Sequence, residues 1–313
     1  MKTRTYKFPI PGRLNLLIAG VQVALLVFLL WSAGQVFSWL WLLVLAPAFG
    51  VVGISAVLLA HEAEHNILHP NRRVNDIVGA LLLLFLPAPF HLIRQGHIWH
   101  HVHNRTDDDA FDFFYEGENS FWTRLQLYGR LTGLFWPVVC FSNVMGLFAP
   151  WTLNPKKNAP NTGGSGFRGS LKPKYQRAIQ IECVGVFALH GTMLWAFDTS
   201  LVRYGILYLA LGFIYSTVQY LFHYGTERHI YKGALNIHAG PVMNAITFNH
   251  SFHLNHHMHP NVPWVYLPFV DTGRPFFSGS VLSAYLRMWN GPKPAKQHYR
   301  TGEGGANHHP DNA

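Results

Sequence analysis

Four long apolar stretches constrain the fold of this chain more than any other feature of its sequence. They cover residues 14–31, 37–60, 178–197 and 201–222. An apolar helix of about 18 residues or more can cross the hydrocarbon core of a bilayer, which is about 30 Å thick. Only 12% of the residues are charged, roughly half the share that is usual in soluble domains. We therefore predict an all-α integral membrane protein with about four transmembrane helices.

The distribution of positive charge predicts the direction of these spans. Basic residues are concentrated in residues 2–13, before the first span, whereas the turn at residues 32–36 carries no charge. The positive-inside rule then places the N-terminus in the cytoplasm. The second span returns the chain to the cytoplasm, where the basic segment at residues 61–177 stays, and the last two spans return it again at His223. Both termini are thus expected on the cytoplasmic side.

Histidines form three clusters, each at the end of a span or after one. His61 and His65 are four residues apart and end the second span. His97, His100 and His101 repeat the spacing of His253, His256 and His257. Residues at positions i, i+3 and i+4 share one face of a helix, so each cluster presents imidazole nitrogens together.

Chance does not account for this pattern. With 20 histidines in 313 residues, about 0.08 matches to the spacing HxxHH are expected at random, and two are present beside HxxxH. Imidazole binds zinc, copper, iron and nickel alike. Eight histidines exceed the four ligands of one tetrahedral zinc ion and suffice for two metal ions, so we predict a two-metal site on a cytoplasmic helical cap.

Two shorter apolar stretches, residues 77–90 and 131–151, test this topology. If only one of them crossed the membrane, the third histidine cluster would lie on the opposite side from the first. If both crossed, the second cluster would be stranded outside. The first stretch has about 14 residues, too few for a comfortable crossing. We expect both to lie at the interface or to dip into it.

The rest of the chain predicts a simple organisation. Residues 1–290 are expected to form one membrane domain and residues 291–313 a disordered tail, with a mobile surface loop at residues 154–174. The two cysteines lie in apolar stretches and predict neither a disulfide framework nor an iron–sulfur cluster. The net charge of +9 comes without a nucleic-acid motif, so we expect anionic lipid headgroups or an acidic electron-donor protein as partners and no nucleic acid.

The motifs HEAEH, HIWHH and HLNHH, in this order and separated by spans, resemble those of the membrane fatty acid desaturase and hydroxylase superfamily over roughly residues 10–290. The resemblance implies two non-haem iron ions, dioxygen as co-substrate and an external electron donor of the ferredoxin, rubredoxin or cytochrome type. It implies removal of hydrogen from an unactivated C–H bond of a lipid or fatty acyl chain, with no catalytic residue separate from the metal ligands. A ninth ligand, His223, is implied after the last span, and Gln219 stands where the family has an Asn that holds a water.

Other polar residues carry weaker expectations. Asp107, Asp108, Asp109 and Asp112 are candidates to orient ligand imidazoles. Arg94 and Arg105 are candidate contacts for a lipid headgroup or a carrier phosphate. The remaining histidines, His250 among them, are expected to be hydrogen-bonded structural residues.

Several activities stay open at this point. An acyl desaturase is the leading interpretation, followed by a hydroxylase or ketolase of carotenoids or alkanes and by a fatty acid decarboxylase that forms terminal alkenes. HEAEH also satisfies HExxH, the motif of zinc proteases, so an intramembrane zinc protease is a rival from another class. A metal transporter is a further rival, but it would need ligands in mid-membrane, whereas these lie at span ends.

Overall fold

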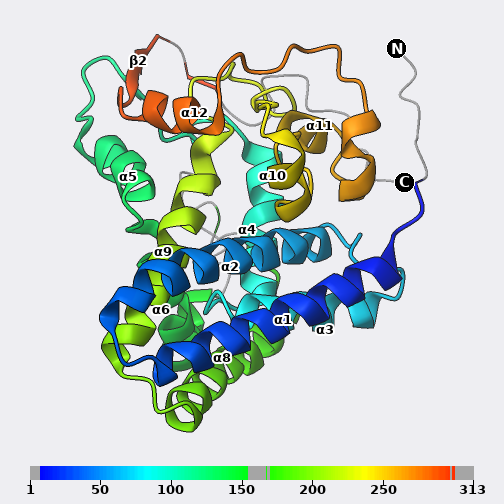
Figure 1. The fold of residues 1–313 in the computed structure, drawn as a ribbon. Coiled ribbons are helices and arrows are strands. Elements are labelled where there is room, and N and C mark those ends of the chain that lie inside the picture. Colours follow the sequence, from blue (N-terminus) through cyan, green and yellow to red (C-terminus); the bar gives the residue numbers. More distant parts are fainter. Residues whose placement is uncertain (1–7, 154–166, 168–169, 297, 300–313) are drawn as a thin grey trace.

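The computed structural model of the 313-residue chain describes residues 8–153, 167, 170–296 and 298–299. These residues fold mostly into helices, and the strands among them are β1 (Phe113–Tyr115) and β2 (Lys293–Ala295), which pair in parallel. Figure 1 shows a lower helical layer that contains α1, α2, α3 and α8, with α5, α10, α11, α12 and β2 above it. The all-α fold predicted from the sequence is confirmed.

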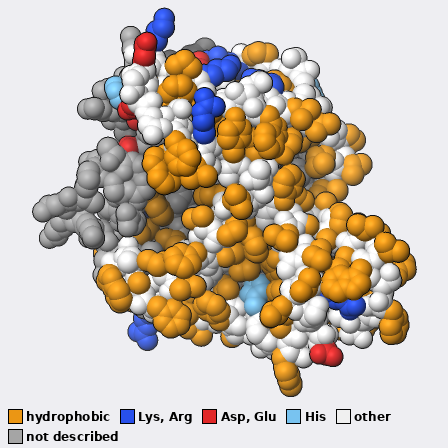
Figure 2. Space-filling view, turned by 90° about the vertical axis from the view of Figure 1, so that its left-hand side faces the viewer, with side chains coloured by type: hydrophobic (Ala, Val, Ile, Leu, Met, Phe, Trp, Pro, Cys, Tyr) orange, Lys and Arg blue, Asp and Glu red, His pale blue; other side chains and the backbone are white. Residues whose placement is uncertain are grey.

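Four helices in the described part of the chain are long and apolar enough to cross a membrane, as predicted. They are α1 (Gly12–Gln35), α2 (Leu42–Glu64), α8 (Gln176–Ala196) and α9 (Leu201–Leu221). Short 3-10 turns, Trp39–Trp41 and Pro173–Tyr175, lead into α2 and α8. Figure 2 shows one face of the molecule, where hydrophobic side chains are widespread and charged ones are few, as expected of a surface that meets lipid.

The two shorter apolar stretches do not form straight spans. The first of these stretches, residues 77–90, contains the second half of α3 (Arg72–Leu84) and the turn that follows it. The 13 residues of α3 reach only about 20 Å. Residues 131–151 belong to a bent pair, in which α5 (Phe121–Leu131) and α6 (Phe135–Phe148) meet at 96°. The chain turns at Gly133, whose φ of +89° is one that side chains rarely adopt. The bend makes this pair a broken span or a re-entrant loop, and the re-entrant form agrees with the prediction that these residues dip in without crossing.

The second span, α2, packs against α1, α3 and α9 in the helical layer. Two glycines of α2 allow α9 to come close. A Cβ added at Gly50 would lie 3.0 Å from Ile214 Cδ1, and one at Gly53 would lie 2.8 Å from Leu211 Cδ1. The buried apolar core continues from these contacts through Phe49 to Tyr208. The last turn of α2, which carries the first histidine motif, is therefore held by helices on several sides.

The upper layer consists of α5, β2 and short helices that lie between the spans or after them in the sequence (Figure 1). α4 (Phe90–His103) runs from the helical layer into it (Figure 1). α10 (Gly240–Ile246), α11 (His253–Met258), the 3-10 helix Trp264–Phe269 and α12 (Val281–Met288) complete it, and a further 3-10 helix, Pro150–Leu153, follows α6. This layer is the helical cap predicted from the sequence, and its cytoplasmic location stays a prediction.

The predicted tail, residues 291–313, has an ordered beginning. Lys293–Ala295 form β2, and the Lys293 amide donates to Asp112 O at 2.8 Å. This pairing depends on β1, which is far away in the sequence, so the composition of the tail does not reveal it. Residues 300–313 lie outside the described residues, as does most of the predicted loop at residues 154–174.

Candidate metal centre

Four helical elements deliver the nine histidines that the sequence singled out. The last turn of α2 carries His61, and His65 is the residue that ends this helix. α4 carries the second cluster in its last two turns, and α11 carries the third, beginning at its first residue. His223 follows α9 directly after the C-cap residue Phe222. All four elements bring their histidines to one region. Such convergence on one side of a membrane requires an even number of crossings between the elements.

The nine imidazoles form two groups in which the potential ligand atoms lie within 4.8 Å of one another. The five-histidine group contains His61, His65, His97, His101 and His256, and the four-histidine group contains His100, His223, His253 and His257. Each HxxHH motif is divided between the groups. The spacing predicted that the three histidines of a motif share a helix face, but not that this face borders two centres.

Facing ring nitrogens indicate what the groups could hold. His65 Nε2 lies 2.7 Å from His97 Nε2, and His256 Nε2 lies 3.0 Å from His101 Nε2. In the other group, His223 Nε2 lies 3.0 Å from His253 Nε2. Lone pairs at this separation repel unless a proton or a cation lies between them. Two nitrogens bound to one ion at about 2.1 Å, with a bond angle of about 90°, would be about 3.0 Å apart, so the arrangement fits metal binding.

Unpartnered nitrogens support the same interpretation. Nε2 of His61 and Nε2 of His257 are buried and have no hydrogen-bond partner among the described residues. A buried polar atom without a partner is costly and requires an explanation. A metal ion within each group would supply the missing partner.

Burial keeps these imidazoles in the form that binds metals. It lowers the pKa of His65 from 6.5 to about 3, and the positive charge of Arg94 adds to the effect. Burial, followed by neighbouring imidazoles, also holds the pKa well below 6.5 for His97, His101, His223, His253, His256 and His257. A neutral imidazole has a free lone pair for a metal, whereas a protonated one has none.

Two histidines of the four-histidine group are oriented through their second ring nitrogen. His223 Nδ1 donates to Gly233 O at 2.8 Å, and His100 Nδ1 is hydrogen-bonded to Asp109 Oδ2. Such contacts select the tautomer and leave Nε2 free for a ligand bond. Asp109 therefore does what the sequence suggested for the acidic segment. Asp107 instead pairs with Arg228, and Asp112 with Arg105.

An asparagine pair positions the third histidine motif. Asn236 Oδ1 accepts the backbone N–H groups of Leu254 and Asn255, at 3.0 and 3.3 Å. Asn236 Nδ2 donates to Asn255 Oδ1 at 2.7 Å, and Asn255 Nδ2 donates to Leu267 O and Val270 O at 2.8 Å. Both asparagines are buried. Sequence reasoning missed Asn236, and the only signal for Asn255 was its place inside HLNHH.

Two arginines with expected headgroup roles have internal partners instead. Arg94 donates to Glu64 O at 3.0 Å and to Asp76 at 2.9 Å, and Arg105 pairs with Asp112 at 2.6 Å. Both arginines thus form ion pairs with aspartates of the fold. His250, for which the sequence predicts a structural role, lies close to the centre, with its ring centroid 4.5 Å from that of His253 and 5.6 Å from that of His61.

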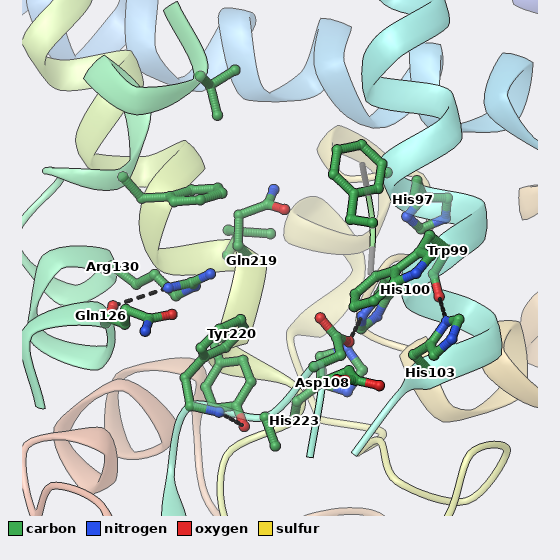
Figure 3. Close-up of a pocket in the computed structure, with 18 of the residues that line it drawn as sticks. His97, Trp99, His100, His103, Asp108, Gln126, Arg130, Gln219, Tyr220 and His223 are labelled. Atoms are coloured by element: carbon green, nitrogen blue, oxygen red, sulfur yellow. Dashed lines mark hydrogen bonds and ion pairs between the residues drawn. The ribbon is translucent and has the colours of Figure 1, made fainter. Parts of the chain in front are cut away.

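A cavity of about 1620 Å³ adjoins both groups. His61 and His97 of the five-histidine group line it, as do His100, His223 and His253 of the four-histidine group. Figure 3 shows His97 and His100 on one wall and Gln219 on the wall across from them. One part of the wall is apolar and includes Ile54, Val57, Leu58, Leu92, Ile93, Val138 and Val139, whereas another part is polar and includes Asp107, Asp108, Glu118 and Arg130. A long apolar molecule in this space would reach both histidine groups.

Comparisons with known proteins show the family of the chain. The model of the family described as "Fatty acid desaturase" matches residues 37–281, which are most of the 313 residues. The chain is 28% identical to the sphingolipid delta(4)-desaturase DES1 of Drosophila melanogaster over 256 residues, which are 80% of this chain and 71% of that protein. It is 28% identical to the sphingolipid delta(4)-desaturase/C4-monooxygenase DES2 of Rattus norvegicus over 243 residues, 74% of this chain and 66% of that protein. The chain therefore belongs to the fatty acid desaturase family and is an oxidoreductase of the lipid desaturase type.

Proposed function

We propose that the nine histidines hold two iron ions and that the chain desaturates a fatty acyl chain. His61, His65, His97, His101 and His256 would hold one ion, and His100, His223, His253 and His257 the other. With dioxygen and electrons from an external donor, bound iron would supply the oxidising power that removes hydrogen from an unactivated C–H bond.

One observation carries the proposal: both histidine groups border the same cavity, and part of its wall is apolar. An alkyl chain that packed on Val57, Leu58 and Val139 would lie in the cavity that His97 and His100 also line. Positioning of this kind decides which bond reacts, because small displacements of the reacting atoms strongly change rates. The apolar part of the wall would also keep water away from the chain where the two are in contact.

The protein's own groups keep the ligand set ready for metal. Burial keeps the imidazoles neutral, so binding does not require proton release from most of them. The contact between Asp109 and His100 and the hydrogen bond from His223 to Gly233 O hold two rings of the four-histidine group in position. From the resemblance, Gln219, which lines the cavity, is proposed to hold a water near this group.

Hydroxylation is a second candidate outcome, because one similar protein is named as both a desaturase and a C4-monooxygenase. The two outcomes begin with the same removal of hydrogen and differ in the second step, which either removes another hydrogen or adds a hydroxyl group. Ketolation or hydroxylation of carotenoids or alkanes and formation of terminal alkenes remain alternatives for the same centre.

The zinc protease interpretation loses support at Glu62. In HExxH this residue would be the general base, which must reach a substrate-bound water. Glu62 is instead buried, accepts the backbone N–H of Trp264 at 2.9 Å and does not line the cavity. A single zinc ion would also leave the four-histidine group without a role.

We further propose that the metal centre and both termini face the cytoplasm and that a ferredoxin, rubredoxin or cytochrome-type protein delivers the electrons there. The positive-inside distribution of the basic residues supports this orientation. We also propose residues 1–290 as one functional domain.

Expression in a host that supplies a suitable reductase tests the proposal, with lipids, pigments and volatile hydrocarbons profiled together. A new unsaturated acyl chain should appear with the wild type and be absent with His256→Ala. A His256→Ala variant that is folded and membrane-inserted but forms full product would contradict the ligand assignment.

A further inference from the structure

One arginine inside the cavity forms no ion pair with an acidic residue that the structure describes. Arg130 lies near the end of α5, is only 8% exposed and lines the cavity. Figure 3 shows it on the same wall as Gln219, across from His97 and His100. A buried charge normally has a charged partner, because removing an ion from water costs several kcal/mol or more.

Asp109 is an acidic residue whose charge acts on Arg130, but neither Asp109 nor Asp112 forms an ion pair with it. Asp109 contacts His100, and Asp112 pairs with Arg105. None of the ion pairs within the described part of the chain includes Arg130. Its Nη1 donates to the carbonyl of Gln126, one turn earlier in its own helix, at 3.0 Å.

Two aromatic rings hold the guanidinium without using its donors. Arg130 Cζ lies 3.6 Å from the ring centroid of Phe111 and 4.5 Å from that of Phe135. A cation over an aromatic face is attracted through the plane of the ring, whereas the guanidinium N–H groups point along its own plane. The rings thus fix the orientation and leave in-plane donors for a ligand in the cavity.

We propose that Arg130 binds the carboxylate of the substrate, so that this enzyme acts on an unesterified fatty acid. The inference rests on the proposed function. A guanidinium and a carboxylate match in a bidentate pair, and the apolar cavity wall around Val138 and Val139 suits the alkyl chain of the same molecule. A thioester or an ester would bring no charge to compensate the buried cation.

Ligand binding by the purified full-length protein in nanodiscs tests the inference. Radiolabelled hexadecanoic acid is bound at pH 8 and displaced by unlabelled hexadecanoic acid or by methyl hexadecanoate. We expect the wild type to prefer the acid. Arg130→Gln should weaken displacement by the acid about 10- to 100-fold relative to wild type, as expected for loss of a charge-assisted pair, and should leave displacement by the ester unchanged.

Two matched variants separate charge recognition from a structural role. Arg124→Gln removes the same charge from an exposed position of α5 and should bind like the wild type. Arg130→Lys keeps the charge and should retain a preference for the acid. A wild type that binds the ester as tightly as the acid would overturn the inference, as would an Arg130→Gln variant that weakens acid and ester equally.

The binding assay does not depend on turnover, so it separates this inference from the proposed function. Preference for the acid in protein that forms no product would support the role of Arg130 and contradict the function. Product formation from an acyl ester by a wild type without acid preference would do the opposite.

Discussion

Replacement of Asp109 by Asn should weaken one of the two metal sites and spare the other. Asp109 is buried, and its contact with His100 Nδ1 orients a ligand of the four-histidine group only. Asn keeps the volume and removes the charge. Loss of such an outer partner typically reduces metal affinity 10- to 100-fold, which corresponds to about 1.4 to 2.7 kcal/mol.

Chelator challenge of iron-loaded protein measures this effect. Wild type and Asp109→Asn are exposed to increasing concentrations of an iron chelator, and the iron left per chain is counted. The variant should release one ion at about 10- to 100-fold lower chelator activity and keep the second as the wild type does. Asp107→Asn is the matched control, because Asp107 lies in the same segment but pairs with Arg228 and Tyr115. Equal retention of both ions, or their joint loss, would show that Asp109 does not support the four-histidine group alone.

The ligand set, the cavity wall and the packing of α2 on α3 can each be tested by a single substitution. His223→Ala should reduce the iron content toward about one ion per chain, measured by elemental analysis, and an unchanged content would remove His223 from the ligand set. Leu58→Trp places a larger side chain at the apolar wall of the cavity and should lower product from long acyl chains about 10-fold more than from short ones. The product profile measures this ratio, and an unchanged chain-length preference would contradict the prediction. Gly79→Val should lower the free energy of unfolding by about 1 to 3 kcal/mol, because an added Cβ would lie 2.7 Å from Ala63 Cβ. Gly20→Val is the control, because a Cβ at Gly20 would have nothing within 4 Å, and it should destabilise the protein less in thermal unfolding. Equal destabilisation by both variants would contradict the packing of α2 on α3.

The helical layer was predictable because the requirement for a membrane span is local. A run of apolar residues decides it without reference to the rest of the chain, and the four spans match the predicted stretches. The convergence of the histidines was predictable for a different reason. Histidine clusters that bind one metal site must lie on the same side of the membrane, so the number of crossings between them is even. For this reason the sequence predicts that residues 77–90 and 131–151 do not cross.

The division of ligands between the two groups was not predictable from spacing. His97, His100 and His101 share one face of α4, and their assignment depends on which imidazoles of α2 and α11 face them. That information lies in tertiary packing. The same holds for Asn236, whose contact with Asn255 joins a loop to the third motif without any local pattern.

Charged residues illustrate the limit most clearly. Arg94 and Arg105 lie beside the second histidine motif and are candidate contacts for a headgroup or a carrier phosphate by sequence. In the structure, both pair with aspartates of the fold. Arg130 belongs to no motif, and the rings that contact it in the cavity, Phe111 and Phe135, come from other segments. Sequence patterns identify ligand types, whereas the partners of a buried charge depend on the folded chain.

The metal content of the purified wild-type protein tests the central claim most directly. Metals are quantified by elemental analysis against protein determined by amino-acid analysis, with His256→Ala measured in parallel. We expect about two iron ions per chain, one for each of the two histidine groups, and fewer in the variant. One zinc ion per chain, with no iron and no change in His256→Ala, would contradict it.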